Sequence, residues 1–166
     1  FIVGLKSEIF GVFLGGEQNY IKNEIEFKYY SSITDNIVFA NRFKYGLISE
    51  FVGYDSNLQN DNYFYLGGTS TLRGWLDPYE YNGYLGSNQR AVFNSEIRIN
   101  IYNNFGISLF SDNGILESIN SNSSHNVGWG VYYITPLGPA KVDIAYIVGS
   151  EYISKPIVQF SLLNMF

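Results

Sequence analysis

The chain has 166 residues, of which 46% are hydrophobic and 18% aromatic, and its formal net charge is −5. An acidic chain without a cluster of Lys and Arg is unsuited to nucleic acid, so we expect no such partner. It contains no Cys, which excludes disulfides and thiolate chemistry, and no run of eighteen apolar residues, which excludes a transmembrane helix.

Polar and apolar residues alternate with a period of two along most of the chain, which is typical of β-strands with one polar and one apolar face. In chain order, the alternating segments are residues 1–13, 20–30, 36–47, 90–102, 105–112, 127–135, 141–146 and 157–166. The sequence therefore predicts an all-β, antiparallel fold of eight strands in a single domain, residues 1–166.

The basic residues gather on the polar faces of these segments. In segment 90–102, for example, Arg90 and Arg98 share a face with Glu96, while Phe93 and Ile97 share the other. In a soluble β-sandwich the polar face meets water, whereas in a membrane barrel the apolar face meets lipid and the charges line the interior. Alternation alone leaves both interpretations open. The basic residues on polar faces are Lys6, Lys22, Lys28, Arg42, Lys44, Arg90, Arg98 and Lys141.

The lengths of the connections favour the membrane barrel. Short connections (31–35, 102–104, 135–139) alternate with longer ones (50–89, 113–126, 149–156), as periplasmic turns and external loops do in such barrels, and the first hairpin is the exception. We expect a transmembrane β-barrel in a bacterial outer membrane, in contact with its lipid, with a long external loop at about 50–89. An aromatic girdle is expected near the short turns, made by Tyr29, Tyr30, Tyr102, Phe105, Tyr132 and Tyr133.

Five sequence blocks carry a resemblance to a known family. In chain order they are residues 66–75 (LGGTSTLRGW), 94–98 (NSEIR), 109–114 (LFSDNG), 128–133 (GWGVYY) and 135–143 (TPLGPAKVD). This series resembles the C-terminal barrel half of the BamA/TamA superfamily of outer-membrane assembly and secretion proteins, over about residues 35–166. Phe166 is similar to that family's terminal aromatic residue, which is part of the signal read by the assembly machinery.

The resemblance implies an internal site around Arg73. In the family, the arginine of an Arg-Gly-aromatic motif lies on an external loop folded back into the barrel, and it contacts acidic residues on the next two strands. Carried over by motif, we expect Arg73, Gly74 and Trp75 to be held by Glu96 and Asp112. Both carboxylates fall on the predicted polar face, and a guanidinium is suited to binding two carboxylates. The alternative is that Arg73 is a solvated loop residue.

Eight strands can close in two ways, because unpaired strand edges cannot face lipid. The chain could form a closed eight-stranded monomer, whose interior has room only for side chains. Two copies could instead join edge to edge into one sixteen-stranded barrel. Since the loop needs space inside, we expect the homodimer, with Phe160, Leu162 and Phe166 of the last strand at its seam.

The resemblance implies a role in insertion, assembly or translocation of outer-membrane proteins, which would be client partners. A seam between the first and last strands would open, and a client strand would add to the exposed edge. Family members usually have sixteen strands and periplasmic domains, and we expect neither within this chain. The alternative is therefore a structural or passive-pore barrel that has lost assembly activity.

An enzyme is a third possibility that the sequence does not favour. His125 is the only His and follows Ser123 and Ser124 in a predicted external loop, but no orienting acid or oxyanion motif accompanies it. The acidic residues at 77–82 lack the spacing of a calcium loop. We expect no catalytic residue, no metal and no cofactor.

Overall fold

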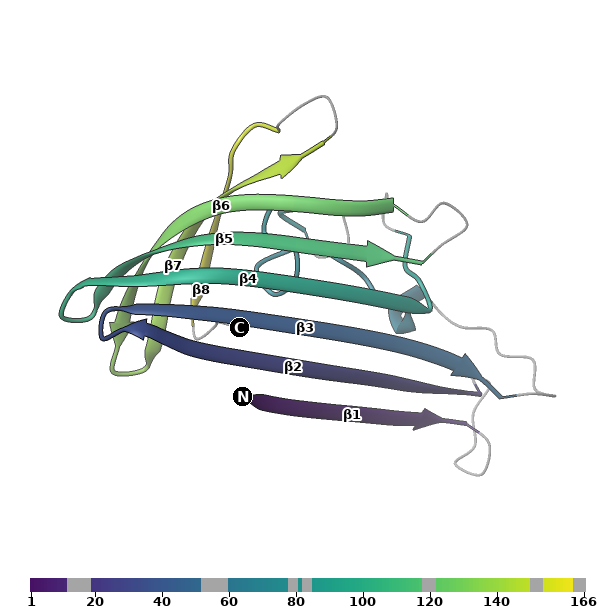
Figure 1. The fold of residues 1–166 in the computed structure, drawn as a ribbon. Coiled ribbons are helices and arrows are strands. Elements are labelled where there is room, and N and C mark those ends of the chain that lie inside the picture. Colours follow the sequence, from purple (N-terminus) through teal and green to yellow (C-terminus); the bar gives the residue numbers. More distant parts are fainter. Residues whose placement is uncertain are drawn as a thin grey trace.

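The computed structural model describes residues 1–11, 19–51, 60–77, 81, 85–117, 122–149 and 154–162. In this part of the chain, eight strands form one antiparallel sheet in sequence order (Figure 1). The sheet curves around the segment that follows β3, so that this segment lies on its concave side. The strands are β1 (Ile2–Phe10), β2 (Tyr20–Thr34), β3 (Ile37–Glu50), β4 (Gln89–Tyr102), β5 (Phe105–Leu116), β6 (Asn122–Thr135), β7 (Gly138–Val148) and β8 (Ile157–Leu162); a 3₁₀ helix, η2 (Asn60–Asn62), follows β3.

The sheet is open, with β1 and β8 as its two edge strands. Each strand pairs with its neighbours in sequence, and within the described residues no pairing joins β1 to β8. The prediction of eight antiparallel strands is confirmed, whereas the alternative of a closed eight-stranded monomer does not describe this structure. The loop occupies the concave side, and an eight-stranded interior would have no space for it. None of the helical residues described forms a helix long and apolar enough to cross a membrane.

Several strands extend further than the alternation predicts: β2 continues to Thr34, β3 to Glu50, and β7 runs from Gly138 to Val148, so most of the expected connection 31–35 is strand. The same holds for the two strands beside His125. β5 continues to Leu116 and β6 begins at Asn122, because backbone pairing persists through polar pairs such as Asn113 opposite His125. The connection between them is therefore shorter than the expected 113–126. His125 lies in a strand and not in an external loop, which corrects the sequence-based interpretation.

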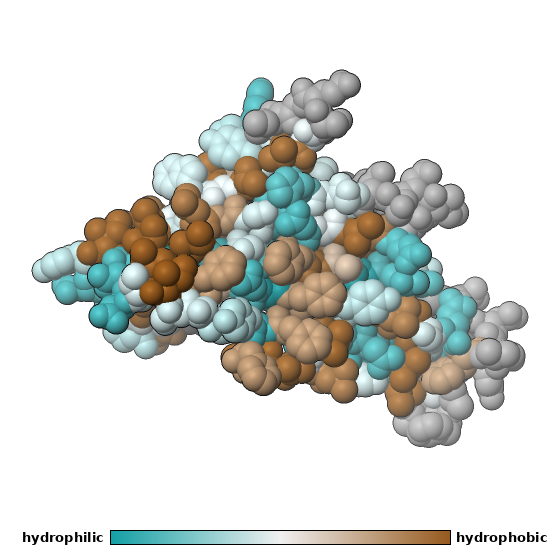
Figure 2. Space-filling view, in the orientation of Figure 1, coloured by the Kyte–Doolittle hydropathy of each residue, from teal (hydrophilic) through white to brown (hydrophobic). Residues whose placement is uncertain are grey.

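The two faces of the sheet differ in chemistry as the alternation predicts. On β5, buried Ser108 and Asp112 alternate with the exposed Leu109, and β8 has buried Gln159 beside exposed Phe160. Figure 2 shows hydrophobic side chains spread over much of the outer surface of the strands. Apolar residues outside and charges inside are the arrangement typical of membrane barrels. Exposed apolar residues include Val3, Leu5, Phe27, Phe43, Phe93, Leu109, Trp129, Val158 and Leu162.

A small apolar core holds the loop against the concave side. Phe64, Leu66 and Leu72 from the loop pack against strand residues and are at most 3% exposed. Gly46 on β3 makes room for Phe64, because a Cβ there would collide with the ring. The strand residues of this core are Tyr20, Ile48, Val92 and Leu116.

The aromatic girdle is smaller than expected. Tyr132 is only 5% exposed and lies on the concave side against Gly106, and Tyr30 lies near the Arg98 guanidinium, 5.9 Å from its ring centroid. Neighbouring residues of a strand point to opposite faces, so each Tyr-Tyr pair is divided. The four remaining aromatic residues are exposed: Tyr29, Tyr102, Phe105 and Tyr133.

Candidate functional site

The turn that carries Arg73 is built on two glycines. Gly67 and Gly68 have positive φ angles of 137° and 72°, which favour glycine. The Thr71 hydroxyl accepts a hydrogen bond from the Gly67 N–H at 2.8 Å and donates one to the Gly67 carbonyl at 2.7 Å. The Gly68 N–H donates to the Trp75 carbonyl at 2.8 Å, so the turn is closed on itself and directs Arg73 towards the sheet.

Arg73 lies between two strands and binds both. Its Nε and Nη2 donate to the two carboxylate oxygens of Asp112 on β5, each at 2.7 Å, and its Nη1 donates to Glu96 Oε2 on β4 at 2.7 Å. The Arg73 side chain is 5% exposed and both carboxylates are 0% exposed. The structure thus brings together three residues that the sequence singles out, and Arg73 is a buried residue and not a solvated one.

Further ionic residues balance the charge around Arg73. Lys141 on β7 lies 2.8 Å from Glu96 and 3.2 Å from Asp143, and Arg98 contacts Glu96 at 2.9 Å. Asp143 also approaches Arg73, at 3.5 Å. Three cations thus face three carboxylates, which reduces the cost of burying each charge. We call Arg73, Glu96, Arg98, Asp112, Lys141 and Asp143 the Arg73 cluster.

Neutral groups complete the surroundings of the cluster. The Arg73 guanidinium lies 3.5 Å from the centroid of the Phe110 ring, a cation–π contact. Asn94 donates to Asp112 Oδ1 at 2.7 Å and to the Thr71 carbonyl at 2.8 Å, while its own oxygen accepts from Arg42 Nε at 3.1 Å. These contacts connect the turn to β3, β4 and β5 at once.

The charge on Arg73 is fixed by its surroundings. Burial lowers the pKa of Arg73, but the carboxylates of Asp112, Glu96 and Asp143 raise it by more, and the net result lies above the usual value. The guanidinium is therefore charged at every pH at which the fold persists.

Gly74 and Trp75 extend the contacts of the turn to the last strands. A Cβ on Gly74 would lie 2.8 Å from side-chain atoms of Asn126 and Ile147, so only glycine fits without displacement. Trp75 Nε1 donates to Ser124 Oγ on β6 at 2.9 Å. Gln159 Nε2 on β8 donates to the Trp75 carbonyl at 2.7 Å. Because Arg42 on β3 also donates to the Ser70 carbonyl, the turn contacts every strand from β3 to β8.

Several members of this site were not singled out from the sequence. Lys141, Asp143 and Arg98 each fall on the predicted polar face of their segment. Alternation therefore places their side chains on the concave side of the sheet, but it does not indicate what they bind. Gln159 carried no signal beyond its place between Val158 and Phe160. Their partners depend on the curvature of the sheet, which a local pattern does not encode.

The remaining sequence-derived residues lie elsewhere. Phe160 and Leu162 are on the convex side of β8 and are 61% and 59% exposed, away from the Arg73 cluster, and Phe166 lies outside the described residues. Ser124 faces the concave side while His125 is exposed and contacts Asn113, so these neighbours on β6 point to opposite faces. Among the residues that the structure describes, no group of three or more His, Cys, Asp or Glu could hold a metal ion.

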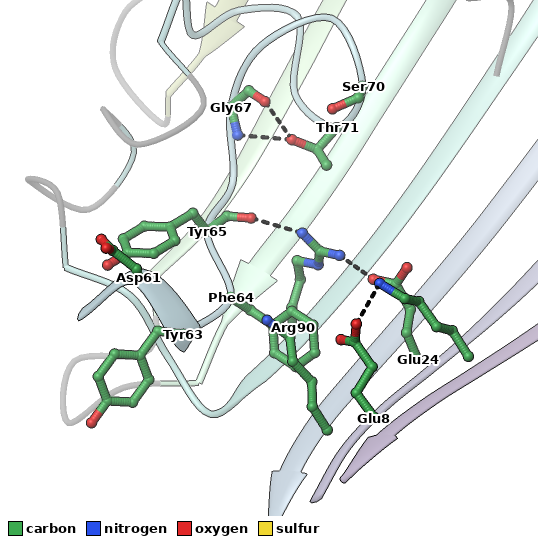
Figure 3. A pocket seen from close by; sticks show the side chains of 12 residues that line it. Glu8, Glu24, Asp61, Tyr63, Phe64, Tyr65, Gly67, Ser70, Thr71 and Arg90 are labelled. Atoms are coloured by element: carbon green, nitrogen blue, oxygen red, sulfur yellow. Dashed lines mark hydrogen bonds and ion pairs between the residues drawn. The ribbon is translucent and has the colours of Figure 1, made fainter. Parts of the chain in front are cut away.

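A polar cavity of about 330 Å³ lies beside the turn, between the concave faces of β1, β2 and β4 and loop residues 61–71. Its wall carries charges of both signs: Lys6, Lys22 and Arg90 face Glu8 and Glu24. Figure 3 shows Arg90 reaching from β4 to the Tyr65 carbonyl, at 3.0 Å, and to Glu24. The concave side is thus hydrophilic next to the edge strand β1 and tightly packed around Arg73.

Comparison with known proteins agrees with this architecture. A family model described as the Omp85 superfamily domain matches residues 1–162, nearly the whole chain. No curated protein matches the chain. Proteins of this superfamily are outer-membrane barrels of assembly and translocation, and the match confirms the expected kinship with the BamA/TamA type of barrel half. Because the family model covers nearly the whole chain, this protein belongs to the Omp85 superfamily.

Proposed function

We propose that this chain spans a bacterial outer membrane as half of a barrel, that a second copy closes the barrel, and that the assembly inserts or translocates other outer-membrane proteins. The observation that carries the proposal is the open sheet, whose edge strands β1 and β8 have no partner on their outer sides among the described residues. In lipid, each unpaired backbone group costs several kcal/mol. Both edges therefore require another β-segment.

A second copy can supply that segment. With an even number of antiparallel strands, β1 and β8 run in opposite directions, so β1 of one copy and β8 of the other can pair in antiparallel fashion. Both strands also present apolar residues on the convex side, such as Leu5 and Phe160. A two-fold axis then creates two identical seams and one sixteen-stranded barrel with room for both loops.

The proposed mechanism uses the seam for β-augmentation, in which an extended client strand adds to an exposed sheet edge. β8 is the weaker side of that seam, because among the described residues six residue pairs join β8 to β7, whereas nine pairs join β1 to β2. We propose that the Arg73 cluster keeps the loop seated on the remaining strands while β8 exchanges its partner. In this role Arg73 and Asp112 support the edge without touching the client.

Cross-linking tests the proposed seam. The chain has no Cys, so Val3→Cys and Phe160→Cys can be introduced together without background labelling. Oxidation of the membrane-embedded protein is expected to yield a covalent dimer on denaturing gels. The control is Trp129→Cys, which lies on the convex face of β6, away from both edge strands, and is expected to give no covalent dimer. Failure of the double variant to cross-link when it is correctly inserted would overturn the edge-to-edge dimer.

Depletion tests the proposed activity. If the barrel inserts clients, removing it from cells is expected to lower the amounts of other outer-membrane proteins, measured by quantitative mass spectrometry of membrane fractions. Complementation by the unaltered chain is expected to restore them. Unchanged amounts of all other outer-membrane proteins would contradict an assembly role.

A structural or passive-pore barrel is the second candidate, and the charged cavity beside β1 favours it. A concave wall with both charge signs and about 330 Å³ of free space is compatible with passage of small solutes. The expected observation in that case is a steady conductance in planar bilayers together with no insertion of client proteins into the same bilayers.

A further inference from the structure

A row of polar side chains interrupts the apolar convex face. Asn41 on β3, Ser95 on β4 and Ser111 on β5 lie directly opposite one another in the sheet register. Ser95 is the seventh of the fourteen residues of β4, and its neighbours on the same face are Phe93 and Ile97. The row therefore lies near the middle of the strands and not at a membrane surface.

This row is poorly satisfied within the chain. The side chains of Asn41 and Ser95 make no hydrogen bond to any part of the protein that the structure describes, and Ser111 accepts one from Asn113 at 3.3 Å. Hydrocarbon cannot supply the missing partners, and unpaired amide and hydroxyl groups are costly there. An ion pair cannot satisfy these groups either, since the side chains of the row carry no charge. The missing groups must be neutral donors and acceptors at the same depth.

The surface around the row is shaped to receive a neighbour. Asn41, Phe43 and Phe93 border a hollow of about 320 Å³ on the convex side, which extends over β2 to Phe1 and Ile2 at the start of the edge strand β1. Phe43 and Phe93 are opposite each other in register, and their exposed rings form one edge of it. Small Ser side chains next to this edge allow the backbone of a second protein to approach closely.

We propose that this row is a contact site for a second copy of the chain, wall against wall, distinct from the seam between β1 and β8. The inference rests on the proposed membrane location. Copies inserted in the same direction carry the row at the same depth, so each row meets its equivalent about an axis normal to the membrane. Amide and hydroxyl groups both donate and accept, which makes the row complementary to itself. Phe43 of one copy then fills the hollow of the other.

A single cysteine tests this contact. Ser95→Cys lies at the centre of the row, and oxidation in native membranes is expected to link two chains through it. The matched control is Val142→Cys on β7, which is 37% exposed on the convex face and outside the row, and it is expected to remain monomeric on denaturing gels. If the correctly inserted Ser95→Cys variant does not cross-link, the wall contact is overturned.

An apolar variant separates this contact from the seam. Asn41→Leu with Ser95→Leu replaces the row by residues that suit lipid, so insertion is expected to be retained while the wall dimer weakens by about tenfold in dissociation constant, as interhelical polar contacts in membranes suggest. Cross-linking between Val3→Cys and Phe160→Cys is expected to be unchanged in this variant. An unaltered dissociation constant of the wall dimer would overturn the wall contact and leave the proposed seam untouched. Loss of membrane insertion by the unaltered chain would instead overturn the proposed function together with this contact.

Discussion

At the scale of single residues, Arg73 is the most constrained side chain of the site. It binds Asp112 through two parallel hydrogen bonds of 2.7 Å and reaches Glu96 with its remaining nitrogen. This geometry needs the planar fork of a guanidinium, which a lysine cannot provide. Because all three side chains are at most 5% exposed, water cannot replace a missing partner.

Removing this guanidinium is expected to destabilise the protein strongly. Arg73→Met leaves Asp112 without its cation, and breaking a buried pair in this way costs about 3–5 kcal/mol of unfolding free energy. Urea unfolding in detergent micelles, followed by tryptophan fluorescence, measures the change. The control is Lys155→Met, at an exposed position outside the strands, which is expected to change stability by less than about 0.5 kcal/mol.

A second substitution identifies the cause of that loss. Asp112→Asn in the Arg73→Met background removes the stranded charge and is expected to recover about 1–3 kcal/mol, within the coupling energies found for contacting residues. If the double variant is no more stable than Arg73→Met, packing of the arginine and not its charge would account for the effect.

At the scale of elements, the loop is fixed by shape as well as by charge. The turn at residues 67–75 approaches β6 and β7 so closely that Gly74 has no space for a side chain. Sequence alternation predicted the strands beneath this turn but gave no distance between turn and strands. That separation is decided by the small residues at the contact.

Adding one methyl group tests the seating of the loop. Gly74→Ala places a Cβ 2.8 Å from side chains of Asn126 and Ile147, and such overpacking costs about 1–3 kcal/mol of unfolding free energy. The displaced turn is also expected to be cleaved faster by trypsin after Arg73. In the control Gly4→Ala on β1, the nearest atom to the new Cβ is 3.8 Å away, so we expect no measurable change. Equal effects of the two substitutions would show that the turn tolerates displacement.

At the scale of the whole molecule, short and long connections lie at opposite ends of the sheet (Figure 1). The turns after β2, β4 and β6 are two residues long, at 35–36, 103–104 and 136–137. If the strands cross a membrane, these turns lie on one side of it and the long loops on the other.

Cysteine labelling of intact cells tests this orientation. Leu137, in the turn after β6, is 88% exposed, and Lys155, between β7 and β8, is also exposed. A membrane-impermeant maleimide added outside is expected to label Lys155→Cys but not Leu137→Cys. After permeabilisation of the outer membrane, both variants are expected to react. Labelling of Leu137→Cys before permeabilisation would reverse the orientation or place the chain outside the membrane.

The division between what could and could not be predicted follows from the range of each interaction. Alternation is local, since neighbouring residues of a strand point to opposite faces. It therefore separated Leu109 from Asp112 correctly and placed Lys141 on the concave side before any partner was known. It failed where polar residues continued a strand, as around His125, because backbone pairing there does not depend on which side chains are apolar.

The sequence alone determined the strand count, the direction of each face and, by its resemblance to a family, the contact of Arg73 with Glu96 and Asp112. Only the tertiary structure decided that the sheet is open, that Asp143 and Lys141 join the cluster, and that Gln159 ties β8 to the turn. These features require residues far apart in the chain to meet, and the curvature of the sheet and the packing of the loop decide where they do.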